Sequence, residues 1–388
     1  MDDRPWRTGE LFPRARLFAR GRFALLEGLR ALAAVRGVRR LWVPAYLCRP
    51  VVDAAAAAGL ATALYDVDER LEPRWATIAP AAGDALLALH YFGLALPKEA
   101  VQAFAAAHRL PLVEDCAHAV PDPDAAVQVG SYGALAFFSL RKQVPMPGGG
   151  LLVVGDDDVD AAVRAPVRAG VGDLRTLAKL GLMLVERAAT ALDWNVLPVK
   201  DRLPVLDAHP AAGRRPRAPM ADAAHSPQPA GTPAPLALLR PMLARLDWRP
   251  HILARQATYR ALAARLNGVP GLVVPIATPP SGSVPQALPV WVDDPDAVVR
   301  ALRARGVEAM RWPGREQIPF RASACPGTVA WLARTVLLPL GWSPDPGRLD
   351  AVLSAVAAAA DGARKSARAS VADAGSLERR CALSDCGR

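Results

Sequence analysis

LVEDCAHA (residues 112–119) and LAFFSLRKQVPMPGGG (residues 135–150) are the two stretches that decide the fold. Each contains most of a short apolar run, Leu110–Asp115 and Ala134–Leu140, of the kind that forms a strand buried on both faces. The first run ends in an acid and is followed by a histidine, and a lysine and three glycines follow the second run. Because the carboxyl ends of parallel strands meet at one edge of a sheet, we expect these residues to gather there.

The chain before these stretches alternates between apolar runs and periodic amphipathic runs. Apolar residues recur at helical spacing after Gly21, and the run Arg40–Pro44 ends in a proline that closes a buried strand. Strands that alternate with helices form a parallel α/β sheet. The predicted strands are Arg40–Pro44, Thr62–Val67, Ala85–His90, Leu110–Asp115, Ala134–Leu140 and Gly150–Val154. Leu11–Ala34 is predicted to be an approach segment followed by a helix, and the other predicted helices are Val51–Gly59, Lys98–His108 and Leu174–Asp193.

A domain boundary is expected after the first half of the chain. Residues 197–235 are rich in proline, alanine and arginine with weak periodicity, which predicts a long loop or linker. We therefore expect a large domain at 1–235, a smaller C-terminal α/β domain at 236–361 and a disordered tail at 362–388. The predicted elements of the second domain are helices at Leu236–Leu246, Arg255–Leu266, Asp296–Arg305 and Leu349–Ala360 and strands at Leu288–Val292 and Val336–Leu338.

Composition excludes several classes of protein. The 388 residues are 52% hydrophobic, which is ample for a core and excludes a chain disordered throughout. The start, MDDRPWRTGE, lacks an apolar signal region, and Lys179, Glu186 and Arg187 interrupt the apolar stretch 174–192, so we expect a cytoplasmic protein without an integral membrane segment. The net charge of +10 comes with no nucleic-acid motif, so we expect no nucleic-acid partner.

Cysteine and lysine usage narrows the chemistry. The five cysteines form no CxxC pair and no histidine stands at zinc-ligand spacing, so we expect reduced thiols and no metal site. Lysine is rare, which leaves few candidates for lysine chemistry: Lys98, Lys142, Lys179, Lys200 and Lys365.

Three clusters lie at predicted strand ends: 90–93 (HYFG), 113–119 (VEDCAHA) and 138–150, which contains Lys142 and the glycine run. An acid, a hydroxyl and a lysine, with glycines that permit close approach of the backbone, suit a cofactor that carries a phosphate, a basic ring nitrogen and an aldehyde.

At these residues the sequence resembles the DegT/StrS-type sugar aminotransferases, which are fold-type I pyridoxal-phosphate (PLP) enzymes. The resemblance runs from about Gly21 to Ala360 and implies a large domain with a mostly parallel central sheet flanked by helices, and a smaller C-terminal α/β domain. Its landmarks, in order, are ARGRFAL (19–25), VPAY (43–46), DVD (66–68), HYFG (90–93), EDCAHA (114–119), GSYG (130–133) and FSLRK (138–142) with its glycines.

The resemblance implies the catalytic residues. Lys142 would hold PLP as a Schiff base and then move the substrate proton, and Asp115 would pair with the pyridine nitrogen. His118 would lie beside the cofactor, near its phenolic oxygen. Each residue also has an ordinary alternative: a surface lysine, a turn or cap residue, and a structural histidine.

The resemblance also implies a phosphate site. Ser139 would lie near the phosphate, and Gly21 and Arg22 would open the helix whose free N–H groups face it. The family more often has a small hydroxyl residue at the position of Arg22. His90 would end its strand close to the cofactor, although a packing or hydrogen-bonding role fits that residue equally well.

Three departures from the family pattern place the chain in an atypical branch. Cys48 stands where the family usually has the aromatic residue that stacks on the PLP ring, and Tyr46 is the candidate substitute. The Asn-x-Arg-Met stretch, whose asparagine reaches the partner subunit's phosphate, is not recognisable at Ala224–Gly231. The loop after Lys142 is compact and lacks the acid often found before the last two glycines.

We therefore expect a PLP-dependent aminotransferase that moves an amino group from an amino acid, glutamate by family inference, to a keto sugar held as a nucleotide conjugate. Such a reaction belongs to polysaccharide or antibiotic sugar biosynthesis. The segment Arg311–Arg315 (RWPGR) offers an aromatic ring and two guanidinium groups for a diphosphate, or is simply a turn with a packed tryptophan. Family precedent suggests a homodimer, with the apolar segment Leu174–Asp193 as a candidate contact.

Two other functions stay open. One is a PLP-dependent sugar dehydratase, in which the family replaces the lysine by histidine. The other is a non-catalytic protein of the same fold that acts as a sensor or assembly partner, consistent with the missing aromatic residue and the missing partner-subunit motif.

Overall fold

The computed structural model describes residues 4–144, 146–167, 181, 232–340, 350 and 353–358. The predicted helix at Leu174–Asp193, most of the predicted linker at 197–235 and the predicted tail at 362–388 lie outside the described residues. Among the described helices, none is long and apolar enough to cross a membrane.

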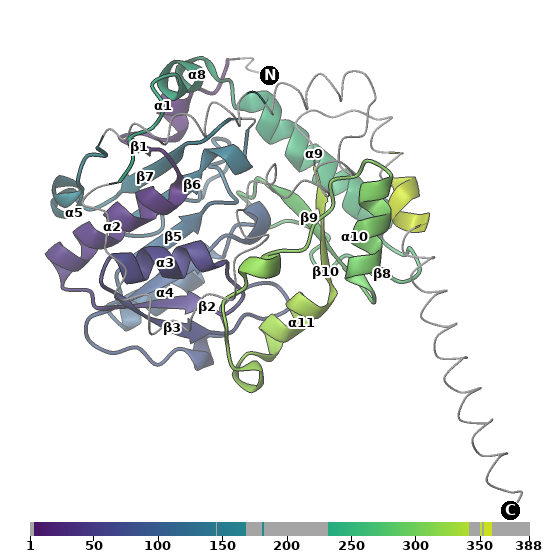
Figure 1. Ribbon diagram of the computed structural model, residues 1–388, viewed down its shortest axis with the longest axis horizontal. Coiled ribbons are helices and arrows are strands. Elements are labelled where there is room, and N and C mark those ends of the chain that lie inside the picture. The colour runs from purple at the N-terminus through teal and green to yellow at the C-terminus, as the bar shows by residue number, and fades with distance from the viewer. Residues whose placement is uncertain are drawn as a thin grey trace, which may run out of the picture.

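A seven-stranded sheet with strand order β1-β7-β6-β5-β4-β2-β3 organises the first half of the chain (Figure 1). Strands β2 to β6 run parallel to one another, whereas β7 pairs antiparallel with both β6 and β1. The predicted α/β class is therefore confirmed. The strands are β1 (Arg16–Phe18), β2 (Arg40–Pro44), β3 (Ala61–Tyr65), β4 (Asp84–Leu89), β5 (Leu112–Cys116), β6 (Leu135–Ser139) and β7 (Gly150–Val154).

Helices connect these strands much as the periodicity predicts. Helix α2 begins at Gly21, buries Leu25, Leu29 and Leu32 along one face, and ends at Gly37, whose φ of 66° provides a left-handed C-cap. The α-helices among the described residues of this half are α1 (Thr8–Leu11), α2 (Gly21–Arg36), α3 (Arg49–Ala57), α4 (Lys98–Ala107) and α5 (Asp157–Ala162).

The register of the parallel strands brings the predicted chemistry to one edge of the sheet. Leu89 at the end of β4 pairs with Asp115 in β5, and Asp115 pairs with Phe137 in β6. The backbone N–H of His90 donates to the Asp115 carbonyl at 3.1 Å. The residues that follow β4, β5 and β6 are therefore neighbours, as the strand ends predict.

The second half contains a three-stranded antiparallel sheet of order β10-β9-β8, which lies with α9 and α10 on the right of Figure 1. The sequence predicts β9 and β10 but not the two-residue strand β8 or helix α11. The elements are α8 (Leu239–Arg245), α9 (Arg249–Leu266), β8 (Leu272–Val273), β9 (Ala287–Val292), α10 (Pro295–Ala304), α11 (Pro326–Arg334) and β10 (Thr335–Pro339), and 353–358 are also helical.

Residues 236–252 pack on the N-terminal side of the molecule. Leu239, Leu243 and Trp248 share a buried cluster with Phe12 and Phe138, and α8 lies beside α1 in Figure 1. The division of domains at residues 235 and 236 stays a prediction, and this short stretch after it belongs by its packing with the large sheet.

Candidate active site

Lys142 lies in the single turn that follows β6, a 3-10 helix at Leu140–Lys142. The turn is held by backbone hydrogen bonds from Leu140 N–H to the Gly149 carbonyl (3.1 Å) and from Gln143 N–H to the Leu140 carbonyl (2.9 Å). The buried Arg255 guanidinium of α9 donates to the Gln143 side chain and, at 3.5 Å, to the Lys142 carbonyl. The backbone that carries the lysine is therefore supported from both halves of the chain.

The Lys142 amine contacts a histidine whose tautomer can be assigned from its other contact. Nζ of Lys142 lies 2.9 Å from Nε2 of His118, while Nδ1 of His118 accepts the Phe92 backbone N–H at 3.3 Å. Since Nδ1 is an acceptor, a neutral His118 carries its proton on Nε2 and donates it to Lys142. The amine then accepts a hydrogen bond, which only its neutral form can do.

The electrostatics of the two groups agree with this assignment. Burial is the main cause that lowers the pKa of Lys142 below its usual value, and the Arg141 guanidinium lowers it further. Burial is also the main cause that holds the pKa of His118 well below its usual value, and positive charge on Lys142 or Arg141 would act in the same direction. A neutral lysine beside a neutral histidine is the arrangement that a nucleophilic amine requires.

Asp115, the next-to-last residue of β5, carries a buried carboxyl group directed at the same region. Its Oδ1 accepts the Ala117 N–H at 2.9 Å, and Oδ2 has no hydrogen-bond donor within the described part of the chain. Burial raises the pKa of Asp115 to about 6, although the Ala117 N–H and the Lys142 amine oppose the shift. Near neutral pH this carboxylate is ionised and has one oxygen free to pair with a cationic N–H.

His90 serves the scaffold around Asp115. Its Nδ1 accepts the Leu96 N–H at 3.1 Å, so Nε2 donates to Oε2 of Glu114 at 3.2 Å. The fully buried Glu114 carboxylate also accepts the N–H groups of Gly130 and Tyr132, each at 2.7 Å. The geometry favours the hydrogen-bonding role for His90.

His90, Glu114 and the buried Cys116 form a group that could in principle bind a metal. The histidine and the carboxylate are already paired with each other, and the carboxylate accepts two backbone N–H groups in addition. Hydrogen bonds within the protein therefore account for this arrangement.

The start of α2 lies against the turn that carries Lys142. A Cβ on Gly21 would stand 3.0 Å from the Phe138 carbonyl oxygen and 3.3 Å from Cβ of Ser139. A Cβ on Gly150 would lie 2.2 Å from the backbone carbon of Arg20. Glycine at these positions is what lets the helix end approach the strand ends so closely.

This helix end has the character of an anion site. No side chain caps α2, and the buried hydroxyl of Ser139 has no hydrogen-bond partner among the residues described. Burial, together with repulsion from the guanidinium groups of Arg141 and Arg22, lowers the pKa of Arg20 to about 10. These three cations lie close enough to repel one another and have no hydrogen-bond acceptor in the described chain, although the Glu316 carboxylate acts on Arg141. The excess of positive charge favours a multivalent anion.

Cys48, rather than Tyr46, is on the side of the site. The Tyr46 ring is fully buried, stacks on Tyr91 with centroids 5.4 Å apart, and donates its hydroxyl to the Trp312 carbonyl at 2.8 Å. Burial raises the pKa of the Cys48 thiol to about 11, and the nearby Lys142 amine opposes that shift. Tyr46 therefore lies behind the site, within an aromatic cluster.

Two residues of the second half reach the site: Trp312, which the sequence offers only as a candidate contact for a diphosphate, and Glu316, which it does not indicate. The Trp312 ring lies edge-on to His118, with centroids 5.1 Å apart. Glu316 follows in the same loop, close enough to influence the pKa of Lys142. A backbone bridge between Cys48 and Gln317 holds this loop over the site.

The predicted diphosphate role of Arg311–Arg315 is not what the contacts of Arg311 favour. Its guanidinium donates to Asp296 of α10 at 2.9 Å and to the Leu332 carbonyl of α11, so Arg311 connects two helices of the second half. Trp312 is packed, as the alternative interpretation of this segment has it. The position of Trp312 next to His118 depends on tertiary structure, and no local sequence signal indicates it.

The residues present fit PLP in four respects: a neutral lysine amine, a buried carboxylate with a free oxygen, an unpartnered serine hydroxyl, and an uncapped helix end beside three arginines. They depart from it at Cys48, which offers no ring for stacking. The candidate partner-subunit stretch at Ala224–Gly231 lies outside the described residues.

Comparison with known proteins supports the same assignment. Residues 20–183 match the model of the DegT/DnrJ/EryC1/StrS aminotransferase family, which confirms the resemblance that the motifs predict. A curated relative, the UDP-N-acetyl-3-dehydro-alpha-D-glucosamine 3-aminotransferase of Acidithiobacillus ferrooxidans, is 30% identical over 154 residues, or 38% of this chain. The chain spans 41% of the length of that relative.

Solved structures match over a longer range. An aminotransferase of the same family from Brucella abortus is 15% identical, with a TM-score of 0.61 over 90% of this chain and 87% of that one. Helicobacter pylori PseC, an aminotransferase of pseudoaminic acid biosynthesis, is 12% identical, with a TM-score of 0.62 over the same shares. These likenesses confirm the fold-type I aminotransferase fold.

Proposed function

We propose that this chain is a PLP-dependent transaminase that takes an amino group from glutamate and delivers it to a nucleotide-linked keto sugar. The observation that carries the proposal is the contact between Nε2 of His118 and Nζ of Lys142, which presents a neutral amine beside the buried Asp115 carboxylate. The match of residues 20–183 to an aminotransferase family, and the UDP-sugar named for the curated relative, support the reaction and the acceptor class.

Each residue has a distinct task in this proposal. The Lys142 amine would hold the coenzyme through its aldehyde carbon, with loss of water, and when free it would move a proton at the substrate Cα, because its lowered pKa leaves it neutral more often than an ordinary lysine. Asp115 would accept the ring N–H with the oxygen that the Ala117 N–H leaves free. When bound, PLP supplies an electron-accepting ring that weakens the bonds at the substrate Cα. His118 orients the amine and excludes water from one side of it.

The phosphate of the coenzyme would be held at the start of α2. The uncapped N–H groups of that helix and the Ser139 hydroxyl would donate to its oxygens, and Arg22 and Arg141 would supply charge. Arg22 stands where the family usually has a small hydroxyl residue, so in this chain a guanidinium group takes over the contact.

The experiment uses the purified full chain with added PLP. We expect a visible absorption band that is absent from Lys142→Ala and present in Lys98→Ala, a lysine on α4 whose amine contacts Ser131 instead. Glutamate should discharge the band, and a panel of nucleotide-linked keto sugars should restore it with consumption of the donor. A colourless protein that takes up no PLP would favour the non-catalytic sensor or assembly protein.

Lys142 argues against the sugar dehydratase, because the family's dehydratases have histidine in place of this lysine. If the sugar lost a hydroxyl group and no glutamate were consumed, the dehydratase would be favoured over the transaminase. The cytoplasmic location and the homodimer stay predictions, and sedimentation of the purified chain tests the second.

A further inference from the structure

Helix α11 begins without a cap of its own. Its N-cap residue, Cys325, makes no side-chain capping hydrogen bond, and proline occupies the first helical position. The N–H groups of Gly327 and Thr328 would thus lack partners in an isolated helix.

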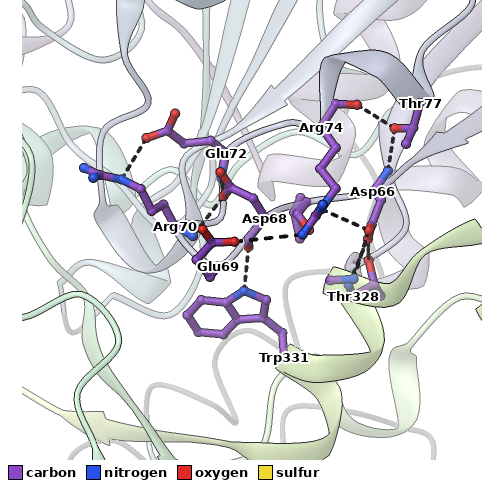
Figure 2. A network of polar contacts seen from close by, with 11 residues as sticks. Asp66, Asp68, Glu69, Arg70, Glu72, Arg74, Thr77, Thr328 and Trp331 are labelled. Carbon is purple, nitrogen blue, oxygen red and sulfur yellow. Dashed lines mark hydrogen bonds and ion pairs between the residues drawn. The ribbon is translucent and has the colours of Figure 1, made fainter.

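Asp66 from the other half of the chain takes the place of the missing cap (Figure 2). Its fully buried carboxylate accepts the Gly327 N–H at 2.9 Å, the Thr328 N–H at 2.8 Å and the Thr328 hydroxyl at 2.9 Å. Arg74 approaches the same carboxylate at 3.4 Å. A Cβ on Gly327 would lie 1.7 Å from the Val67 carbonyl oxygen, so the two segments are in direct backbone contact.

The capped helix in turn positions the loop that covers Lys142. Trp331 of α11 donates its indole N–H to the Asp68 carbonyl at 2.9 Å and stacks near Tyr46, with centroids 6.3 Å apart. Arg311 donates to the Leu332 carbonyl at the end of the same helix. Trp312 follows Arg311 directly and its carbonyl accepts the Tyr46 hydroxyl, so α11 fixes Trp312 on two sides.

We propose that Asp66 and Thr328 form a latch between the two halves of the chain that holds Trp312 against His118 and thereby orients His118 on Lys142. Both are positioning residues. The biological role of the latch depends on the proposed function of Lys142, but the experiments that test the latch do not. Loss of the latch lets Trp312 and His118 move, and Lys142 then loses its hydrogen-bond donor and part of its shielding from water.

The variants are chosen to separate the effect of the hydrogen bonds that cap α11 from the effect of the charged loop around Asp66. Asp66→Asn places an amide NH2 among the helix N–H groups, and Thr328→Val removes one hydroxyl. Thr328→Ser keeps that hydroxyl. Asp68→Asn is the matched control, because the Asp68 carboxylate accepts the N–H groups of Arg70 and Glu72 in its own loop and not those of α11.

The first measurement is amide hydrogen exchange of the full chain without coenzyme. In Asp66→Asn and Thr328→Val we expect exchange in residues 310–318 and 326–334 to accelerate about tenfold, with strand β4 unchanged. Thr328→Ser and Asp68→Asn should resemble the parent protein. Unchanged exchange at 310–318 in both cap variants would overturn the latch.

The second measurement is the pH profile of Lys142 acetylation by acetic anhydride, followed by mass spectrometry. The charged and titratable groups that act on Lys142 are Cys48, Asp115, His118, Arg141 and Glu316, and the variants leave all five in place. In Asp66→Asn we expect the pH midpoint of Lys142 acetylation to rise by about half a pH unit, which is about a threefold change in the ratio of charged to neutral amine.

A midpoint unchanged in both cap variants, despite faster exchange, would reduce the cap to a structural contact and overturn the positioning role. Thr328→Val keeps the test decisive if Asp66→Asn does not fold, as judged by circular dichroism. Because neither measurement requires coenzyme, failure of the latch and failure of the proposed transaminase activity are told apart.

Discussion

Nε2 of His118 lies 2.9 Å from Nζ of Lys142, and its Nδ1 is already engaged by the backbone N–H of Phe92. The histidine is thus able only to donate toward the lysine while it stays neutral. The hydrogen bond stabilises the free amine over the ammonium ion, and burial acts in the same direction. The contact between His118 and Lys142 therefore favours the neutral, nucleophilic form of the lysine near neutral pH.

Replacement of His118 tests this contact. In His118→Phe the amine loses its donor, so its pKa should rise and the neutral fraction at pH 7 should fall by about 2- to 10-fold, the worth of one hydrogen bond. The rate at which added PLP develops its visible band, measured from pH 6 to 10, should shift to higher pH. His118→Gln, whose amide can still donate, is the control and should retain most of the rate. An identical pH profile in all three proteins would contradict the assigned tautomer.

Most of the fold could be predicted because it depends on local apolar periodicity. Strands β2 and β7 have the predicted bounds, and the predicted strand-end clusters meet at one edge of the sheet. Helix α11 could not be predicted, because its first N–H groups are satisfied by Asp66, more than 250 residues earlier in the chain. Its sequence begins with proline and glycine and gives no local sign of a cap.

The same distinction applies to the site. Asp115 ends a predicted strand, and His118 and Lys142 each follow one, so their convergence is a consequence of strand order. Trp312 and Glu316 belong to a loop of the second half, and only the packing of that loop on Cys48 brings them near Lys142. The choice between Tyr46 and Cys48 also depended on packing, since two residues of separation in an irregular segment do not fix which side chain faces the site.

Asp115 should make the coenzyme-free protein less stable as the pH rises. Its folded-state pKa of about 6 lies above the ordinary value of 3.8, so the folded state favours the protonated acid. The associated stability is fully present below pH 4 and is lost as the pH rises through 6, by up to about 3 kcal/mol. Asp115→Asn should abolish this dependence. Urea unfolding of both proteins from pH 4 to 7 measures this dependence. If the free energy of unfolding changed with pH in the same way in both proteins, the raised pKa of the buried Asp115 would be contradicted.

The same substitution should affect catalysis separately from stability. Asp115→Asn removes the negative charge proposed to pair with the coenzyme ring nitrogen, so we expect kcat to fall by at least about 100-fold, as when a preorganised charge partner is removed. The visible band should still form, because Lys142 is untouched. Full transaminase activity in a folded Asp115→Asn protein would remove Asp115 from the proposed machinery.

Gly150→Ala should separate the start of α2 from the strand ends. The new Cβ would lie 2.2 Å from the backbone carbon of Arg20 and 2.3 Å from the Gly21 nitrogen, and neither atom belongs to a flexible side chain. The backbone must therefore move, at an expected cost of about 1–3 kcal/mol in the free energy of unfolding. Because the same movement displaces the helix N–H groups, affinity for PLP and for inorganic phosphate as a competitor should fall together. Gly9→Ala, where an added Cβ meets nothing within 4 Å, is the matched control and should leave both affinities unchanged. Denaturant unfolding and equilibrium titration of the two variants decide the matter: a Gly150→Ala protein with parental stability and phosphate affinity would show that this close approach does not form the anion site.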